Sequence, residues 1–206
     1  MAFWRGKTPS LACDVTLFDR DQLINALGEL VTELRADGQR VGIRLVGGAA
    51  LALRYFDRRS TEDLDALHVR PGTDQVVAQA ADRIADRRGW DHGWLNFTVT
   101  ETAAEPQWGR PVAWQTIHDD GIVMVQVASS DALLAMKLRA NRPGRDTDDI
   151  RQLLAICGVS SVEQADNLYA DFYPGEALSQ RAWNMVVAIF ADAPLSEPDP
   201  PPPFAL

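Results

Sequence analysis

A diglycine at Gly47-Gly48 separates two hydrophobic patterns and constrains the fold more than any other feature of the sequence. Val41 to Val46 is typical of a short strand, whereas Ala49 to Phe56 is rich in alanine and leucine, as a helix is. Glycine has no Cβ and adopts positive φ, so backbone N–H groups at such a turn can approach a phosphate, and the helix dipole favours an anion there. The pattern predicts either an anion site or a tight strand-to-helix turn.

Two carboxylates accompany the next predicted strand, Leu64 to Val69. Asp63 and Asp65 are two residues apart, so their side chains project from the same face of an extended segment. Like charges on an interior strand repel each other and are costly to bury without a cation. The pair therefore predicts a site for Mg²⁺ (or Mn²⁺) that takes its remaining ligands from water and substrate phosphates, and the alternative is an exposed strand edge.

Helical and strand patterns alternate along most of the chain and then give way to helices. This order predicts an α/β (α+β) fold, with a mixed sheet, flanking helices and a helical C-terminal part, rather than a doubly wound fold. The predicted helices cover 19–38, 49–56, 76–88, 131–141, 146–156, 162–172 and 176–190. The predicted strands cover 41–46, 64–69, 94–100, 112–117 and 122–127, the last two as a hairpin.

Composition limits the classes of protein to which the chain can belong. With 206 residues, 46% of them apolar, it can bury a sizeable core. We expect a core over 1–158, C-terminal helices packed on it over 159–193, and a disordered proline-rich tail over 194–206. No segment has the length of a signal peptide or a membrane span, so we expect a cytoplasmic protein without a membrane partner.

Charge is distributed unevenly. The net charge of −9 argues against a broad basic face for nucleic acid, because phosphate neutralisation supplies most non-specific affinity. Basic residues nevertheless gather in two clusters that either line a cleft for an anion or form solvated helix faces. These clusters are Arg54, Arg58 and Arg59, and then Lys137, Arg139, Arg142 and Arg145.

Lys137 lies on a predicted helix among leucines. It either places an ammonium beside phosphates or packs its stem on the core with the amine in water. Asp146 and Asp149 share a helix face further on, with Asp148 as a possible addition. They either complete the acidic site or orient Lys137, unless Asp146 only caps its helix.

Three motifs together resemble the DNA polymerase β superfamily of nucleotidyltransferases, and most of all the MenT/AbiEii toxin group. The motifs are Gly47-Gly48, the stretch from Arg59 to Asp65 with Thr61 and Asp63 within it, and the Leu133 to Ala140 stretch that contains Lys137. The Arg145 to Ile150 segment resembles the final acidic motif of the same group. The resemblance covers about Val41 to Leu154.

The resemblance implies transfer of a nucleoside monophosphate from a nucleoside triphosphate to an acceptor hydroxyl, and it implies a role for each matching residue. Asp63 and Asp65 are the implied metal ligands. The implied catalytic residues are Asp63, Asp65, Lys137 and Asp149, and the implied nucleotide-binding residues are Gly47, Gly48, Arg59, Ser60, Thr61 and Lys137. The implied acceptor is the 3′ end of tRNA, and a cognate antitoxin is the implied partner.

Two departures from the superfamily pattern leave alternatives open. The diglycine and the acidic pair are widely spaced, and the predicted strand over 122–127 offers only Gln126 where members often carry a third carboxylate. Either the Asp146 segment helps the pair to bind metal, or catalysis is weak or lost. The alternatives are therefore nucleotide transfer to a protein or small molecule, or a degenerate fold that binds a partner.

Overall fold

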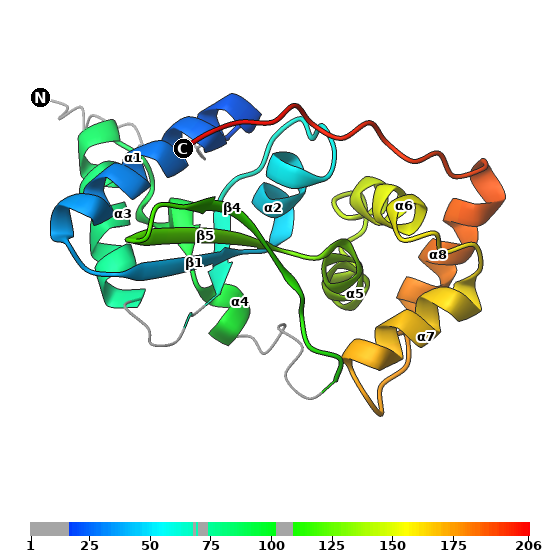
Figure 1. The fold of residues 1–206 in the computed structure, drawn as a ribbon. Helices are drawn as coiled ribbons and strands as arrows, with labels where there is room; N and C mark the ends of the chain where they lie inside the picture. The colour runs from blue at the N-terminus through cyan, green and yellow to red at the C-terminus, as the bar shows by residue number, and fades with distance from the viewer. Residues whose placement is uncertain (1–16, 68, 70–73, 102–108) are drawn as a thin grey trace, which may run out of the picture.

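A computed structural model describes residues 17–67, 69, 74–101 and 109–206, so parts of the predicted core, including 1–16, and residue 68 of the predicted strand over 64–69 lie outside the described residues. The N-terminal half forms a sheet flanked by helices, and the C-terminal half is a cluster of helices beside it (Figure 1). The final proline-rich segment runs back from the helical cluster to the first helix (Figure 1).

The sheet is mixed, with the strand order β3-β2-β1-β5-β4. The central strand β1 pairs in parallel with β5 and antiparallel with β2, and β2 pairs in parallel with β3. β4 and β5 form the predicted antiparallel hairpin. The strands are β1 (Val41–Leu45), β2 (Leu64–Leu67), β3 (Leu95–Asn96), β4 (Trp114–Asp119) and β5 (Val123–Ala128). The mixed α/β fold predicted from the sequence is thus confirmed.

The helices begin and end close to the predicted residues because their sequences carry local start and stop signals. The first helix, for example, begins with a capping box between Asp19 and Gln22 and ends at Gly38 in the left-handed conformation. The helices are α1 (Arg20–Asp37), α2 (Gly47–Arg54), α3 (Asp74–Arg88), the 3₁₀ turn η1 (His92–Trp94), α4 (Thr98–Glu101), α5 (Ser130–Ala140), α6 (Thr147–Ile156), α7 (Val162–Phe172) and α8 (Gln180–Asp192). Among the described residues, no helix combines the length and the apolar character that crossing a membrane requires.

The predicted strand over 94–100 is wrong beyond its first residues. β3 ends at Asn96, whose side-chain oxygen accepts a hydrogen bond from the Thr98 backbone N–H at 3.0 Å. Asparagine side chains commonly compete in this way with the strand ladder. The chain therefore leaves the sheet after Asn96 and begins the short helix α4.

Helix α5 connects the two halves of the molecule. Every residue from Ala132 to Leu138 is buried, so other elements pack on most faces of this helix. It contacts α6 and α7 in the helical cluster. A helix in this position can present side chains to a site while its backbone is held by packing on the remaining faces.

The proline-rich tail forms neither helix nor strand, yet it contacts the body of the protein. The Arg20 guanidinium donates a hydrogen bond to the Pro202 carbonyl and lies 5.3 Å from the centre of the Phe204 ring. Leu195, Phe204 and Leu206 are partly buried against the core. Proline fixes φ and lowers the entropy lost on ordering, so a few apolar contacts suffice to hold the segment.

Candidate active site

Asp63 and Asp65 line the same cleft, which has a volume of about 320 Å³. Asp65 belongs to β2, and Asp63 directly precedes that strand. One wall of the cleft is a face of α5, formed by residues spaced three and four apart. The cleft residues of α5 are Leu133, Met136, Lys137 and Ala140.

Burial makes ionisation of both carboxyl groups costly. It raises the pKa of Asp63 above the usual range of a carboxyl. For Asp65, burial and then the neighbouring charge of Asp63 raise the pKa to about 6. Two repelling carboxylates in a cleft are the electrostatic environment that a cation would stabilise.

The diglycine brings backbone directly against Asp65. Gly47 has a φ of 64°, and a Cβ at this position would overlap the Asp65 carboxylate. The Val46 N–H donates a hydrogen bond to the Asp65 carbonyl at 3.0 Å, which ties the turn to β2. A Cβ at Gly48 would lie 2.6 Å from Thr61 Oγ1, so both positions exclude a side chain for lack of space.

Replacing Gly47 with alanine is expected to lower the free energy of unfolding by about 2–3 kcal/mol. Left-handed backbone costs alanine roughly 1–2 kcal/mol, and displacement of the Asp65 carboxylate adds to that cost. Urea unfolding measures the change. The matched control is Gly28→Ala in α1, where a Cβ would meet nothing within 4 Å, so we expect an increase of about 1 kcal/mol. Equal effects of the two substitutions would contradict this account of Gly47.

Asn96 completes the carboxylate side of the cleft, and the sequence did not single it out. It is the register partner of Asp65, and its Nδ2 donates a hydrogen bond to Asp63 Oδ2 at 3.0 Å. Because its Oδ1 accepts the Thr98 N–H, the amide presents its donor group to the acidic pair. Asn96 therefore holds the carboxylates by hydrogen bonding, and the only sequence signal for it was a polar residue within an apolar predicted strand.

Within the described part of the chain, the acidic pair has no third carboxylate. No group of three histidine, cysteine, aspartate or glutamate side chains is arranged there as a metal-binding cluster. Gln126, the polar candidate on β5, contacts Arg44 and Thr116, and it does not line the cleft. Asp63 and Asp65 are thus the two anionic oxygen donors that the described residues offer to a cation in this cleft.

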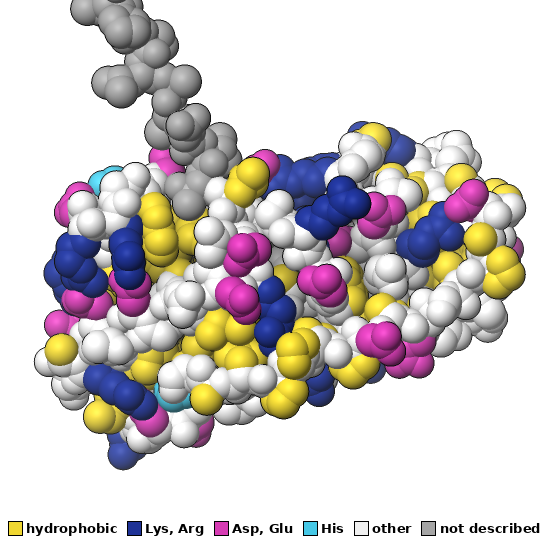
Figure 2. All heavy atoms as spheres, turned by 90° about the horizontal axis from the view of Figure 1, so that it is seen from above, with side chains coloured by type: hydrophobic (Ala, Val, Ile, Leu, Met, Phe, Trp, Pro, Cys, Tyr) yellow, Lys and Arg dark blue, Asp and Glu magenta, His cyan; other side chains and the backbone are white. Residues whose placement is uncertain are grey.

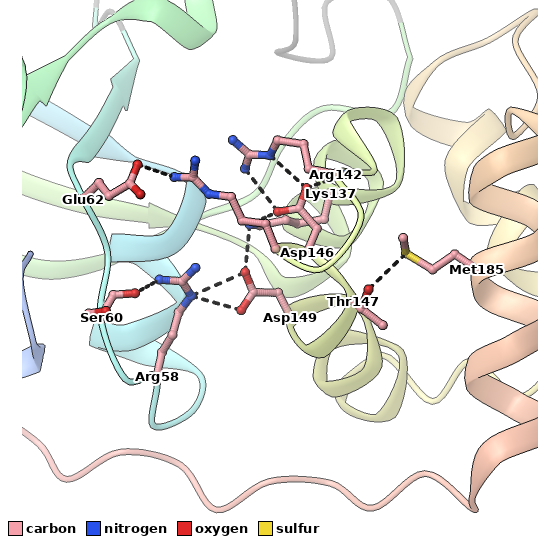
Figure 3. Close-up of polar contacts among 10 residues, drawn as sticks. Arg58, Ser60, Glu62, Lys137, Arg142, Asp146, Thr147, Asp149 and Met185 are labelled. Atoms are coloured by element: carbon pink, nitrogen blue, oxygen red, sulfur yellow. Dashed lines mark hydrogen bonds and ion pairs between the residues drawn. The ribbon is translucent and has the colours of Figure 1, made fainter. Parts of the chain in front are cut away.

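Lys137 lies between two other carboxylates from the start of α6 (Figure 3). Its Nζ is 2.8 Å from Asp146 Oδ1 and 2.8 Å from Asp149 Oδ2. The Lys137 side chain is 6% exposed, and those of Asp146 and Asp149 are 0% and 6% exposed. Arg142 also pairs with Asp146 and Arg58 with Asp149, so Lys137 compensates these two buried carboxylates together with the two guanidinium groups.

Asp146 contacts Lys137 and Arg142 and does not cap its own helix. Its side chain makes no capping hydrogen bond to α6, and it accepts bonds from the Arg142 backbone N–H at 2.9 Å and Arg142 Nε at 3.0 Å. Of the three predicted roles, which were completing the acidic site, orienting Lys137 and capping the helix, the geometry corresponds to orientation of Lys137. Neither Asp146 nor Asp149 lines the cleft of the acidic pair.

Acid is expected to weaken the fold through Asp146. Burial alone would raise the pKa of this carboxyl, but hydrogen bonds and charges from Arg142 and Lys137 outweigh burial and lower it to about 2. The unfolded-state pKa is about 3.9, so the stabilisation is present above pH 4 and is lost as the pH falls toward 2. Asp146 should contribute about 2 kcal/mol to this loss.

Urea unfolding at pH 6, 4 and 2.5 tests this expectation. Asp146→Asn should flatten the pH dependence between 4 and 2.5, whereas Asp192→Asn on the exposed end of α8 should leave it unchanged. The same slope in the wild type and in Asp146→Asn would exclude Asp146 as the source.

The hydroxyl and arginine candidates lie around a second hollow, of about 660 Å³. Arg59, Ser60, Thr61 and Asp148 line it, and so does Asp149. Thr61 is buried, and its hydroxyl donates a hydrogen bond to the Asp63 carbonyl at 3.2 Å. The structure therefore places these residues next to the diglycine and the acidic pair, but outside the cleft that both carboxylates line.

Arg58 connects the second hollow to the Lys137 group. Its Nε is 3.0 Å from Asp149 Oδ1, and its Nη1 donates a hydrogen bond to the Ser60 carbonyl (Figure 3). The same guanidinium lies over Gly48, where a Cβ would approach Nη1 to 3.0 Å. The sequence placed Arg58 in a basic cluster, but 91 residues separate it from Asp149, so sequence alone could not identify this contact.

The residues present fit a divalent cation. The pKa values of both carboxyls are raised in the cleft, and the Asp65 carboxylate packs against Gly47 in the space that a Cβ would fill. Carboxylate oxygens are hard donors of the kind that Mg²⁺ prefers. Asp63 and Asp65 would hold such an ion.

A mixed sheet with a diglycine turn at the end of β1 and a carboxylate pair at the start of β2 is the arrangement of a nucleotidyltransferase of the polymerase β type. Residues 22–192 match the model of a family described as nucleotidyltransferases of unknown function, DUF6036. The chain belongs to this family. No curated protein matched the chain, and neither did any solved structure.

Proposed function

We propose that the protein is a metal-dependent nucleotidyltransferase that moves a nucleoside monophosphate from a nucleoside triphosphate to an acceptor hydroxyl. The observation that carries the proposal is the pair of half-buried carboxylates in the 320 Å³ cleft, with the glycine backbone against Asp65. Asp63 and Asp65 would hold Mg²⁺ or Mn²⁺, which would neutralise charge on the phosphates as pyrophosphate leaves. Asn96 hydrogen-bonds to Asp63, and Gly47 lets the Asp65 carboxylate pack directly against the backbone of the turn.

We propose the 3′ end of tRNA as the acceptor and a toxin–antitoxin pair as the biological setting, in the cytoplasm. The support is the resemblance of the diglycine, acidic and Lys137 motifs to the MenT/AbiEii toxins. Family membership supports nucleotidyl transfer in general. The order of the three motifs along the chain supports the closer assignment.

Labelled-nucleotide transfer tests the proposal directly. The purified protein is incubated with Mg²⁺, total tRNA and each α-labelled ribonucleoside triphosphate in turn, and label in RNA is measured. We expect transfer from at least one triphosphate and none with Asp65→Ala. Absence of label from tRNA, protein and small molecules alike would refute the enzymatic proposal.

A second acceptor class is favoured by the surface charge. The net charge is −9, and basic and acidic side chains are intermingled on the face in Figure 2. Such a face does not attract a polyanion strongly, which favours a protein or small-molecule acceptor. Label in protein or in a small molecule instead of RNA would identify this class.

A non-catalytic fold that binds a partner is the third possibility, and the amide at Asn96 favours it because an amide adds no anionic ligand. Calorimetric titration of the protein with a nucleoside triphosphate in the presence of Mg²⁺ distinguishes this non-catalytic fold from an enzyme. Absence of binding would select the partner-binding function.

A further inference from the structure

Arg142 occupies the end of the cleft where α5 stops. The helix ends at Ala140, and Asn141 turns the chain with a φ of 41° in the left-handed conformation. Arg142 follows and lines the cleft together with Asp63 and Asp65. Leu133 lies about 10 Å before Ala140 along the α5 axis, so the cleft has a cationic end and an apolar end.

Lys137, the other cation of the cleft, already has its charge balanced. It is 6% exposed and ion-paired with both Asp146 and Asp149. The Arg142 side chain is 50% exposed and shares only Asp146. An anion that enters the cleft therefore meets the Arg142 charge more directly than the Lys137 charge.

Asp146 holds the Arg142 guanidinium by one edge. Nε and Nη2 donate to the two Asp146 oxygens at 3.0 and 3.1 Å. Among the described residues, Arg142 Nη1 has no hydrogen-bond acceptor, and Figure 3 shows an outer nitrogen of the guanidinium directed away from Asp146. A guanidinium has five N–H donors in a rigid fork, so the outer edge remains available to a second oxyanion.

The acidic pair is within electrostatic reach of this guanidinium. The hydrogen bond to Asp146 raises the pKa of Arg142, and the charges on Asp65 and Asp63 add to that effect. The Arg142 charge in turn offsets part of the rise that burial causes in the pKa values of Asp63 and Asp65. Asp63 and Asp65 would hold a cation with its phosphates in the same cleft that Arg142 lines.

We propose that Arg142 is the phosphate-binding cation of the cleft and contacts the nucleotide phosphates through the outer edge of its guanidinium. This inference rests on the proposed function, because it assigns a residue to the phosphates of the same substrate. It gives Lys137 a different task, which is to neutralise Asp146 and Asp149 so that Asp146 can hold Arg142.

Calorimetric titration of the full-length protein with inorganic tripolyphosphate in the presence of Mg²⁺ tests the assignment without chemistry. We expect Arg142→Gln to weaken binding at least about tenfold, because a charged phosphate hydrogen bond is lost. Arg142→Lys should recover part of the affinity, since a point charge remains. The control is Arg151→Gln, whose side chain pairs with Asp192 away from the cleft, and it should bind as the wild type does.

Thermal unfolding of each variant identifies any loss of fold. Partial recovery of tripolyphosphate affinity in Arg142→Lys then indicates that the Arg142 charge acts in binding and not only in the structure. If Arg142→Gln binds tripolyphosphate as tightly as the wild type, or the wild type does not bind it, the assignment is overturned. Loss of tripolyphosphate binding in Arg142→Gln without label transfer by the wild type would refute the transferase proposal and leave this assignment standing. Label transfer by the wild type, together with unchanged tripolyphosphate affinity in Arg142→Gln, would support the transferase proposal and overturn the assignment of Arg142.

Discussion

Replacing Lys137 with methionine is expected to lower the free energy of unfolding by about 2–4 kcal/mol. Methionine matches the length of the lysine stem but removes the charge, so the buried Asp146 and Asp149 lose the ammonium that lies 2.8 Å from each and are left with one guanidinium apiece. Domains of this kind have a total stability of about 5–15 kcal/mol, so the variant should lose a large part of it. Urea unfolding followed by circular dichroism measures the change.

Two further variants separate the buried charge from other effects of the Lys137 substitution. Lys137→Met combined with Asp149→Asn should recover part of the lost stability, because one of the two carboxylates that lost the ammonium is removed. Arg151→Met breaks the exposed pair with Asp192 and should cost no more than about 1 kcal/mol. If Lys137→Met is no more harmful than Arg151→Met, the buried group does not carry the stability assigned to it.

Replacing Asp65 with asparagine is expected to reduce nucleotidyl transfer at least about a thousandfold while making the protein more stable at neutral pH. Asparagine keeps the shape but not the charge that would hold the metal, and metal ions supply several kcal/mol of charge stabilisation in such reactions. The stability rises because wild-type Asp65 is charged at pH 7.5 in a cleft where burial and Asp63 raise its pKa to about 6.

The sign of this effect depends on pH. The pKa of Asp65 is higher in the folded than in the unfolded state. Asp65 therefore does not lower the free energy of unfolding below pH 4, where it is protonated in both states, and lowers it increasingly as the pH rises through 6. Asp65→Asn should therefore gain roughly 1–2 kcal/mol at pH 7.5 and nothing at pH 4, after allowance for partial exposure. Urea unfolding at the two pH values, without divalent cations, measures the gain.

A metal titration provides the control for the Asp65 variant. Mn²⁺ should raise the melting temperature of the wild type and of Asp192→Asn, but not that of Asp65→Asn. Transfer by Asp65→Asn within tenfold of the wild-type rate would exclude Asp65 as a metal ligand.

Most helix and strand positions followed from local sequence. The helix over 19–38 carries its own capping box and terminal glycine, and the hairpin around Asp119-Asp120-Gly121 forms where it was predicted. The strand over 94–100 failed because one side chain, Asn96, has a better hydrogen-bond partner in the Thr98 backbone than the ladder offers. The pattern of apolar and polar residues carries no information about this competition between a side-chain hydrogen bond and strand pairing.

Part of the candidate site could also be predicted from residues that lie close together in the sequence. Gly47-Gly48 and the pair at Asp63 and Asp65 were recognisable because each motif depends on spacing of two residues or fewer. The contact between Asn96 and Asp63 crosses 33 residues, and that between Arg58 and Asp149 crosses 91. Which charged group neutralises which depends on packing between segments far apart in the sequence.

By itself, the sequence determined the mixed α/β class, the glycine turn and the two carboxylates, because backbone sterics and the two-residue period of a strand act over a few residues. Only the tertiary structure decided that Lys137 is buried between Asp146 and Asp149, that Asn96 hydrogen-bonds to Asp63, and that Arg142 remains half exposed in the cleft. The physical reason is desolvation. How strongly a charge acts depends on how far it is buried and on which opposite charge lies beside it, and both are fixed only when α5, α6 and the sheet pack together.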